Sequence, residues 1–375
     1  MANKIVIFTP MYNNIYSGVG TYARALVEGL KERNYDISVV SPDCDYDSPS
    51  FIKLKNNKMD PSPNKWISNS MSYNSFLKNP PFKIDIAHFV NAQELLFVKK
   101  LKNIKFVATV HDSYSFDLKY KKLLKENFLD WRSRYIYYNL LFKLERFAFK
   151  KADMIIANTD FVKERLIDFY NIDRDKVLTI YVSALIRNLS NNIKSLSPPF
   201  VVSFIGGNFQ RKGLLNLIKA VKILKERGTD IKIKVAGKDK NQKIIERWIS
   251  KNGFNNIVDF LGHLKPDKVK ELLLHSHIFA MPSINEAFGL VYLEAMAYGV
   301  PVIGTKNGGS KELIKDGENG FLCNPFDPFD IAKKIELLLD EITREAIIEK
   351  GFETVKRFLN YDAVAKTIRL YENLV

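Results

Sequence analysis

The sequence predicts an α/β protein of two doubly wound domains, each a parallel sheet with helices on both faces. Its 375 residues are more than one hydrophobic core usually supports. Short apolar runs typical of buried parallel strands alternate with stretches of helical periodicity. Residues 188–199, NLSNNIKSLSPP, interrupt this alternation with a polar segment that ends in two prolines, and it resumes directly afterwards. We therefore place a linker there.

The first half opens with a continuous apolar run at 4–9 and a helical pattern at 21–33. Gly18 and Gly20 directly precede this helix, where they either let a ligand approach its N-terminus or form a tight turn. The full GxGxxG fingerprint of a dinucleotide site is absent. Residues 42–83 are polar, and we expect loops with little regular structure. The other predicted strands are 37–41, 84–90, 103–112, 152–161 and 176–182, and a further helix is predicted at 162–170.

His111 ends the strand predicted at 103–112. Open α/β sheets bind their ligands at the carboxyl ends of the strands, which makes His111 a candidate site residue. A histidine that only caps a strand end is the alternative.

The second half repeats the alternation of strands and helices. Strands are predicted at 199–207, 231–237, 257–262, 277–281 and 301–305, and helices at 214–227, 242–252, 266–275, 290–298, 328–340 and about 344–373.

Composition is ordinary for a globular protein, with 46% hydrophobic and 26% charged residues. Cys44 and Cys323 lie far apart without metal-ligand spacing, which fits a reducing compartment. The first apolar run is too short for a signal peptide, and no run reaches the ~18–20 residues of a membrane span. We expect a cytoplasmic protein without a metal site.

Positive charge is concentrated in an aromatic window, residues 99–151. This window holds 14 Lys/Arg against 5 Asp/Glu, a net charge of +9 that equals the net charge of the first 190 residues. Cations interleaved with aromatic residues suit an anionic membrane surface. In that case the protein would be peripheral, on the inner face of the membrane. A helix with a buried apolar face and snorkelling cations explains the pattern equally well. Nucleic-acid binding is a third interpretation.

Residues 282–300, PSINEAFGLVYLEAMAYGV, place Glu286 and Glu294 eight positions apart around a predicted helix start. The first turn of a helix offers unpaired N–H groups to a phosphate, and Gly289 leaves that backbone accessible. Because carboxylates repel phosphate, the two acids suit hydroxyl groups on either side of a diphosphate, as in a nucleotide sugar. The alternative is an amphipathic helix with a solvated glutamate at each end.

Two further loops of the second half also follow a strand, so all three should lie along one sheet edge. One contains Arg211 and Lys212, and the other contains Gly308 and Gly309. Fixed cations suit a diphosphate that gains negative charge as its bond to a sugar breaks. An isolated Arg-Lys pair is usually only solvated, but the three loops together indicate sugar transfer.

These residues resemble the motifs of the retaining nucleotide-sugar glycosyltransferases of family 4, whose two-domain fold is called GT-B. The E-x7-E motif is Glu286-AFGLVYL-Glu294, and the glycine-rich loop with basic residues is GGNFQRKG at 206–213. TKNGGSKELI, DGENGFL, SGVGTYARAL and TVHD are also similar to family segments. The resemblance covers nearly the whole chain and is most specific in 203–323. It implies two doubly wound, Rossmann-like domains facing a central cleft.

The resemblance also implies residue roles. Glu294 would bind the ribose, Glu286 the transferred sugar, and His111 would face the anomeric centre. Many members carry arginine after the first glycine of the loop, where this chain has Gly207. The implied catalytic residues are His111, Arg211, Lys212 and Glu286. The implied donor-binding residues are Gly18, Gly20, Gly206, Gly207, Arg211, Lys212, Glu286, Phe288, Gly289, Leu290 and Glu294.

The implied domains are 1–190 on the acceptor side, 191–352 on the donor side, and a C-terminal helix, 353–375, that crosses back to the first domain. Closure about 188–199, with a second hinge strand near 350–358, would exclude water.

The implied reaction transfers a hexose from a nucleoside diphosphate sugar to an acceptor hydroxyl, with retention of configuration. The acceptor would be a glycan or a lipid-linked molecule in cell-surface polysaccharide or glycoconjugate synthesis. No metal or other cofactor is expected, and we expect Asp43 and Asp45 to be solvated. The donor base, among UDP, GDP and ADP, stays open. The alternatives are a GT-B enzyme of other chemistry (a sugar phosphorylase or nucleotide-sugar epimerase), a basic nucleic-acid-binding protein, and an inactive homologue.

Overall fold

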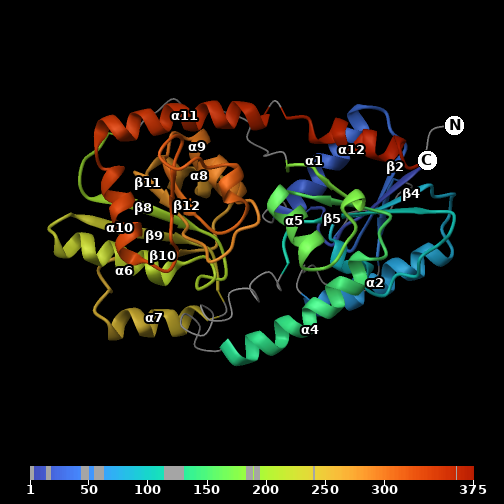
Figure 1. Cartoon of the computed structure of the whole chain (residues 1–375), viewed down its shortest axis with the longest axis horizontal. Helices are drawn as coiled ribbons and strands as arrows, with labels where there is room; N and C mark the ends of the chain where they lie inside the picture. The colour runs from blue at the N-terminus through green and yellow to red at the C-terminus, as the bar shows by residue number, and fades with distance from the viewer. Residues whose placement is uncertain are drawn as a thin grey trace. The chain divides into compact units, whose positions relative to one another are not determined.

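The computed structural model divides into two compact units, each built on one parallel sheet (Figure 1). Unit 1 comprises Met1–Leu185 and Tyr361–Val375, and unit 2 comprises Ile186–Asn360. The structure describes residues 4–13, 18–43, 50–54, 63–113, 131–182, 189, 195–239, 241–359 and 361–375. The two Rossmann-like sheets confirm the predicted fold class.

Unit 1 contains a seven-stranded sheet in the order β3-β2-β1-β4-β5-β6-β7, with all neighbouring strands parallel. The central strands are buried on both faces, which explains their continuous apolar sequences. The strands are β1 Ile5–Phe8, β2 Ile37–Ser41, β3 Phe51–Lys53, β4 Ile86–Phe89, β5 Lys105–Val110, β6 Met154–Ala157 and β7 Val177–Thr179.

The helices of unit 1 cover both faces of this sheet, with α1 and α12 on one face and α2 and α4 on the other (Figure 1). Their bounds are α1 Gly18–Glu32, α2 Pro63–Lys78, α4 Trp131–Phe149, α5 Asp160–Asp168 and α12 Ala363–Glu372. Two short 3₁₀ segments are η1 Ala92–Leu95 and η3 Arg174–Lys176.

Residues 42–83 contain regular structure, so the prediction of loops throughout this region is wrong. β3 and α2 both lie in it. The buried face of α2 is formed by Trp66, Tyr73 and Leu77 at helical spacing, and most of its other positions are Ser, Asn or Lys. A few large side chains are enough to dock the helix, and its polar composition conceals them.

The glycine pair of the first half lies within a helix. α1 begins at Gly18, so Gly18 and Gly20 belong to its first turn, and the predicted start at residue 21 is wrong. The first N–H groups of a helix lack intrahelical partners in any case, which makes the first turn tolerant of glycine.

The C-terminal segment is two helices and not one. α11 spans Glu341–Leu359 without interruption, so the predicted hinge strand near 350–358 is wrong. α12 starts afresh where the Asp362 side chain accepts a hydrogen bond from the backbone N–H of Ala365. α12 belongs to unit 1, where Arg33 donates to Asp362 at 2.8 Å and Tyr35 to Glu372 at 2.8 Å.

Unit 2 contains a six-stranded parallel sheet in the order β10-β9-β8-β11-β12-β13. α6 packs with α10 and α9 packs with α11, and Figure 1 shows these pairs on opposite faces of the sheet. The strands are β8 Phe200–Ile205, β9 Ile231–Ala236, β10 Val258–Gly262, β11 Ile278–Ala280, β12 Val302–Thr305 and β13 Phe321–Cys323. The helices are α6 Leu214–Glu226, α7 Gln242–Lys251, α8 Pro266–Leu274, α9 Leu290–Ala297, α10 Pro328–Leu337 and α11, with a 3₁₀ turn η4 at Gly309–Glu312. No helix in the described ranges is long and apolar enough to cross a membrane.

Candidate functional site

Three loops of unit 2 leave neighbouring strands at the same edge of the sheet. β8 and β11 are adjacent although β9 and β10 separate them in sequence, so the strand order switches between them, and β12 lies beside β11. Ligands of open α/β sheets bind at such a switch point. The loops 206–213, 281–289 and 306–308 therefore place the predicted glycines, cations and Glu286 together.

The central contact of the site is an ion pair between two of these loops. Lys212 Nζ lies 2.5 Å from Glu286 Oε2, and Ser283 Oγ donates to the same oxygen at 3.1 Å. Only 9% of the Glu286 side chain is exposed. Burial raises the pKa of Glu286, but the charges of Lys212 and Arg211 lower it by more, so its pKa lies below the usual value. Glu286 is therefore a charged carboxylate at neutral pH.

Backbone contacts hold the loops of this ion pair together. The N–H of Ile284 donates to the carbonyl of Arg211 at 2.8 Å. Gly213, which precedes α6, has φ +83°, and a Cβ there would lie 1.9 Å from the carbonyl oxygen of Pro282. Only glycine fits this approach. Lys212 thus owes its place beside Glu286 to the glycine that follows it.

Gly289 is the N-cap of α9, and glycine is needed there for a second reason besides access for a diphosphate. Its φ is +88°, and a Cβ would lie 2.5 Å from the ring of Tyr292. Tyr292 is fixed there because its hydroxyl donates to the carbonyl of Met281 at 2.7 Å. Phe288 is buried, and Leu290 is the first residue of the helix.

The third loop pairs with the backbone of Glu286. Gly309 N–H donates to the Glu286 carbonyl at 2.7 Å, and a Cβ on Gly308 would lie 2.1 Å from that oxygen. The two glycines thus support Glu286 from behind. Gly308 is the N-cap of the short 3₁₀ turn η4, and Gly309 is its first residue.

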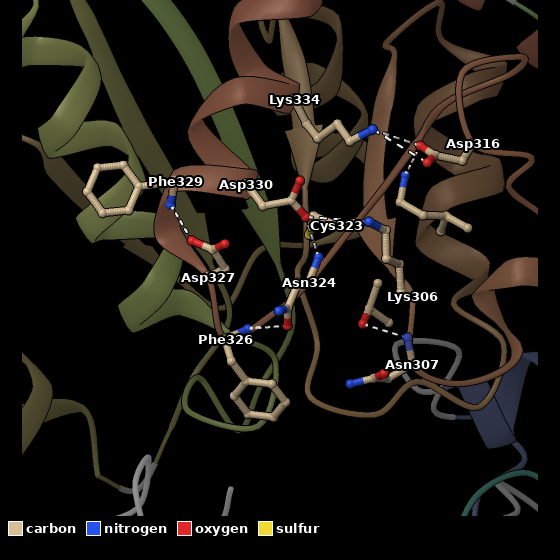
Figure 2. A network of polar contacts seen from close by, with 12 residues as sticks. Lys306, Asn307, Asp316, Cys323, Asn324, Phe326, Asp327, Phe329, Asp330 and Lys334 are labelled. Atoms are coloured by element: carbon tan, nitrogen blue, oxygen red, sulfur yellow. Dashed lines mark hydrogen bonds and ion pairs between the residues drawn. The ribbon is translucent and has the colours of Figure 1, made fainter.

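Figure 2 shows the polar network beyond this loop, at the ends of β12 and β13. Lys306 Nζ lies 3.7 Å from Asp330, whose other contact is the N–H of Asn324 at 2.7 Å. Lys334 binds Asp316 in the same way at 3.2 Å. Burial raises the pKa of the Cys323 thiol, which donates to the Gly304 carbonyl. These contacts hold loop 306–308 in place. The buried Cys323 thiol stays protonated at neutral pH and is not a reactive group.

Glu294 lies in the second turn of α9 and is half-buried. Burial raises its pKa to about 7. No hydrogen bond to its carboxylate is formed by the described residues, in contrast to Glu286. The two predicted acids therefore differ: one is charged and held, and the other titrates near neutrality.

His111 lies in unit 1 directly after β5, as predicted. The edge of its ring meets Tyr22 at a centroid distance of 4.9 Å, and its carbonyl accepts from Asn158 at 2.8 Å. Burial lowers the pKa of His111 to about 4 although the backbone of Val90 accepts a hydrogen bond from it. The imidazole is therefore neutral at pH 7. Gly18 and Gly20 also belong to unit 1.

Ser283 and Tyr292 belong to the site, although the sequence reasoning did not single them out. A serine three residues before a candidate glutamate was the available signal for Ser283. Tyr292 looks like an ordinary apolar position of a buried helix, because its hydroxyl partner is a backbone carbonyl that no side-chain pattern reveals.

Asp43 is buried, so the prediction that it is solvated is wrong. Its carboxylate accepts from the N–H groups of Tyr12 at 2.6 Å and Asn13 at 3.1 Å, which ties the loops after β1 and β2 together. Asp45 and Cys44 lie outside the described residues. Within the described part of the chain, no three His, Cys, Asp or Glu side chains are placed to hold a metal ion.

Two sequence profiles match the chain, one in each half. "Glycosyltransferase Family 4" matches residues 16–182, and "Glycosyl transferases group 1" matches residues 186–354. An uncharacterized glycosyltransferase of Methanocaldococcus jannaschii is 26% identical over 98% of both chains. Sucrose-phosphate synthase from Thermosynechococcus elongatus is similar in structure, with a TM-score of 0.77, 19% identity and 99% of both chains covered. Anabaena HepE in complex with UDP-glucose has a TM-score of 0.68, 20% identity and 99% of both chains covered.

Proposed function

Because the chain belongs to glycosyltransferase family 4 and has the GT-B fold, we propose that it transfers a hexose from a nucleoside diphosphate sugar to an acceptor hydroxyl. Configuration at the anomeric carbon is retained, and the reaction needs no metal ion. The observation that supports this most directly is the buried contact between Lys212 and Glu286 at the switch point of the sheet. In this proposal Lys212 serves a phosphate and the adjacent Glu286 serves a sugar hydroxyl.

In this proposal the diphosphate lies at the N-terminus of α9, and Lys212 and Arg211 offset the charge that develops on it. Fixed cations at the site of developing charge lower the barrier without reorganisation. Glu286 accepts a hydrogen bond from a hydroxyl of the transferred sugar, and Glu294 accepts from the ribose. Binding of UDP-glucose by the similar protein HepE supports a nucleotide sugar as donor.

Retention follows from same-face attack. The bond between the anomeric carbon and the phosphate oxygen breaks, the acceptor oxygen bonds to that carbon on the same face, and the departing phosphate takes the acceptor proton. Glu286 is a poor nucleophile for the alternative double displacement, because Lys212 and Ser283 already bind its carboxylate. His111, as a neutral imidazole, contributes a hydrogen bond to the sugar and no charge.

The acceptor is proposed to be a glycan or lipid-linked molecule presented at an anionic membrane surface. The outer face of α4, which we define as Ile136, Leu140, Lys143 and Phe147, follows helical spacing, and the exposed Lys150 lies directly after the helix. Ile136, Leu140 and Phe147 are 70%, 55% and 58% exposed. Apolar residues between lysines are the pattern of a helix that lies on anionic lipid.

A thermal-shift screen over UDP-, GDP- and ADP-glucose tests the donor assignment. A ligand at 100 times its Kd stabilises the folded state by about 2.7 kcal/mol, and about 2–4 °C per kcal/mol follows for units of this size. The nucleotide sugar with the correct base should give a larger thermal shift than the other two. Lys212→Ala should remove most of that shift and slow transfer, and Lys212→Arg should restore part of both.

Lys222→Ala is the matched control, since Lys222 pairs with Glu226 on the exposed face of α6. Absence of a shift with every nucleotide sugar, in a folded protein, would contradict donor binding. Full turnover by Lys212→Ala would contradict the electrostatic role of Lys212.

A further inference from the structure

A buried carboxylate that the proposed chemistry does not use lies at the carboxyl edge of the unit 1 sheet. Glu145 is on the inner face of α4 and is fully buried. Its Oε2 accepts from Ser113 Oγ at 2.7 Å and from the Tyr170 hydroxyl at 2.6 Å, and its Oε1 accepts from Gln93 Nε2 at 3.1 Å. An acid in this position is costly to bury and needs such donors.

The donors that Glu145 binds come from three different elements. Gln93 lies in η1, Tyr170 follows α5, and Ser113 is in the segment that leaves β5. Gln93 Nε2 also donates to the carbonyl of Asp112 at 3.0 Å. Glu145 therefore joins the two residues that follow His111 to the helix α4.

The segment 111–113 has a side-chain contact at each residue. Asn158 donates to the His111 carbonyl, Gln93 donates to the Asp112 carbonyl, and Ser113 Oγ donates to Glu145. Of these contacts, only the last is made by α4 itself, and Gln93, which makes the second, also donates to Glu145. Removal of Glu145 therefore takes away the common acceptor of Gln93 and Ser113 and loosens the chain directly after His111.

We propose that Glu145 is a positioning residue for the transfer reaction: it fixes segment 111–113 and so the place of the His111 imidazole. This inference rests on the proposed function for the role of His111, but the geometry of the segment can be tested independently. Misplacing a reacting or orienting group by about 1 Å costs on the order of 10²-fold in rate. The donor loops lie in unit 2 and do not include Glu145, so the loss should be in kcat and not in the KM of the donor.

The experiment compares Glu145→Leu, Glu145→Gln and Asn69→Leu in the full chain. Asn69→Leu is the matched control, because Asn69 Nδ2 donates at 2.6 Å to another buried carboxylate of unit 1, Glu94, which follows Gln93 in η1. This variant disturbs η1 but removes none of the hydrogen bonds to Glu145. Two measurements are made on each: donor kinetics, and histidine NMR titration together with hydrogen exchange of residues 105–113. The chain has only five histidines, so the NMR signals can be assigned by single substitution.

Glu145→Leu should lower kcat at least about tenfold with an unchanged donor KM, speed amide exchange at 111–113 and move the His111 pKa upward from about 4. Glu145→Gln should recover most of the kcat and most of the slow amide exchange, since the amide oxygen of glutamine still accepts a hydrogen bond. His277 is buried in unit 2, where its Nδ1 accepts from the N–H of Val201 at 2.9 Å, and its NMR signals should not change.

Unchanged exchange and titration of His111 in Glu145→Leu would overturn the inference whatever the activity. Altered His111 signals with full kcat would also overturn it, by showing that the position of His111 does not matter to transfer. An equal loss of kcat in Asn69→Leu would show that Glu145 acts only through the general stability of unit 1. A wild-type protein with no nucleotide-sugar binding would instead refute the proposed function, while the NMR and exchange data would still decide whether Glu145 holds the segment.

Discussion

At the scale of single residues, two glutamates eight positions apart have opposite environments. Lys212, Arg211 and Ser283 keep the pKa of Glu286 below its usual value despite burial. Glu294 has burial alone, which raises its pKa to about 7. The same residue type is thus an anion at neutral pH in one loop and a titrating group in the neighbouring helix. The charge state of each glutamate is decided by its surroundings and not by sequence spacing.

This difference predicts a pH dependence of donor binding. The folded pKa of Glu294 is above its unfolded value of 4.5, so the stability that the protonated form contributes is lost as pH rises from about 4.5 to about 7. Ribose hydroxyls bind best to the ionised form, and affinity for the nucleotide sugar should rise through pH 7. Glu294→Gln should flatten the pH dependence of both the folding stability and the affinity for the nucleotide sugar.

Calorimetric titration of the nucleotide sugar between pH 5.5 and 8.5 checks this, with unfolding measured on the same samples. The pyrophosphate diester of the donor does not titrate in this range, and neither does His111. A wild-type affinity that does not change with pH would mean that Glu294 does not contact the ribose as an anion.

At the scale of elements, the docking of α12 depends on one glycine of α1. A Cβ on Gly29 would lie 2.6 Å from Cγ2 of Val364, so the two helices approach as closely as they do only because no side chain intervenes. The contact is reinforced from the other end of α12, where the Tyr371 hydroxyl lies 2.5 Å from Nδ1 of the buried His88.

Gly29→Ala should therefore loosen α12 although alanine is the better helix former by about 1 kcal/mol. Overpacking a close contact costs about 1–3 kcal/mol, and the stiff Val364 side chain cannot rotate away easily. Amide exchange in α12 should become faster. Gly18→Ala is the control, because a Cβ at Gly18 meets nothing within 4 Å. Equal exchange in α12 for both variants would show that the contact does not hold the helix.

At the scale of the whole molecule, the excess positive charge lies where a surface function is proposed. In the described part of the window, α4 has an inner face that includes Glu145 and an outer face of apolar residues and lysines. Of the three interpretations of this window, the snorkelling helix and the membrane surface both agree with a helix that is buried on one side. Only the exposure of Ile136, Leu140 and Phe147 favours the membrane.

Flotation with vesicles that contain about 30% anionic lipid tests this surface, at an ionic strength where the Debye length is about 10 Å. The wild type should float, and Leu140→Ser with Phe147→Ser should stay in the dense fraction with its fold unchanged. Ile342→Ser is the matched control, because Ile342 is 82% exposed on α11 of unit 2. Equal flotation of all three proteins, or none of the wild type, would refute a membrane role for α4.

The sequence alone determined the two parallel sheets, because buried strands need continuous apolar runs and helices need periodicity. It also determined the order of the three loops that meet at the edge of the second sheet. It missed α2, whose few large apolar residues are spread among polar ones, and the break between α11 and α12, where both sides have helical patterns.

Only the tertiary structure decided what the site residues do to each other. The ion pair between Lys212 and Glu286, the close approach of Gly213 to Pro282 and the hydrogen bond from Ser113 to Glu145 join residues far apart in the chain. Strand order brings these residues into contact, and a contact between distant positions leaves no periodic pattern in the sequence. The charge state of each acid depends on those contacts, and for that reason it could not be predicted from spacing.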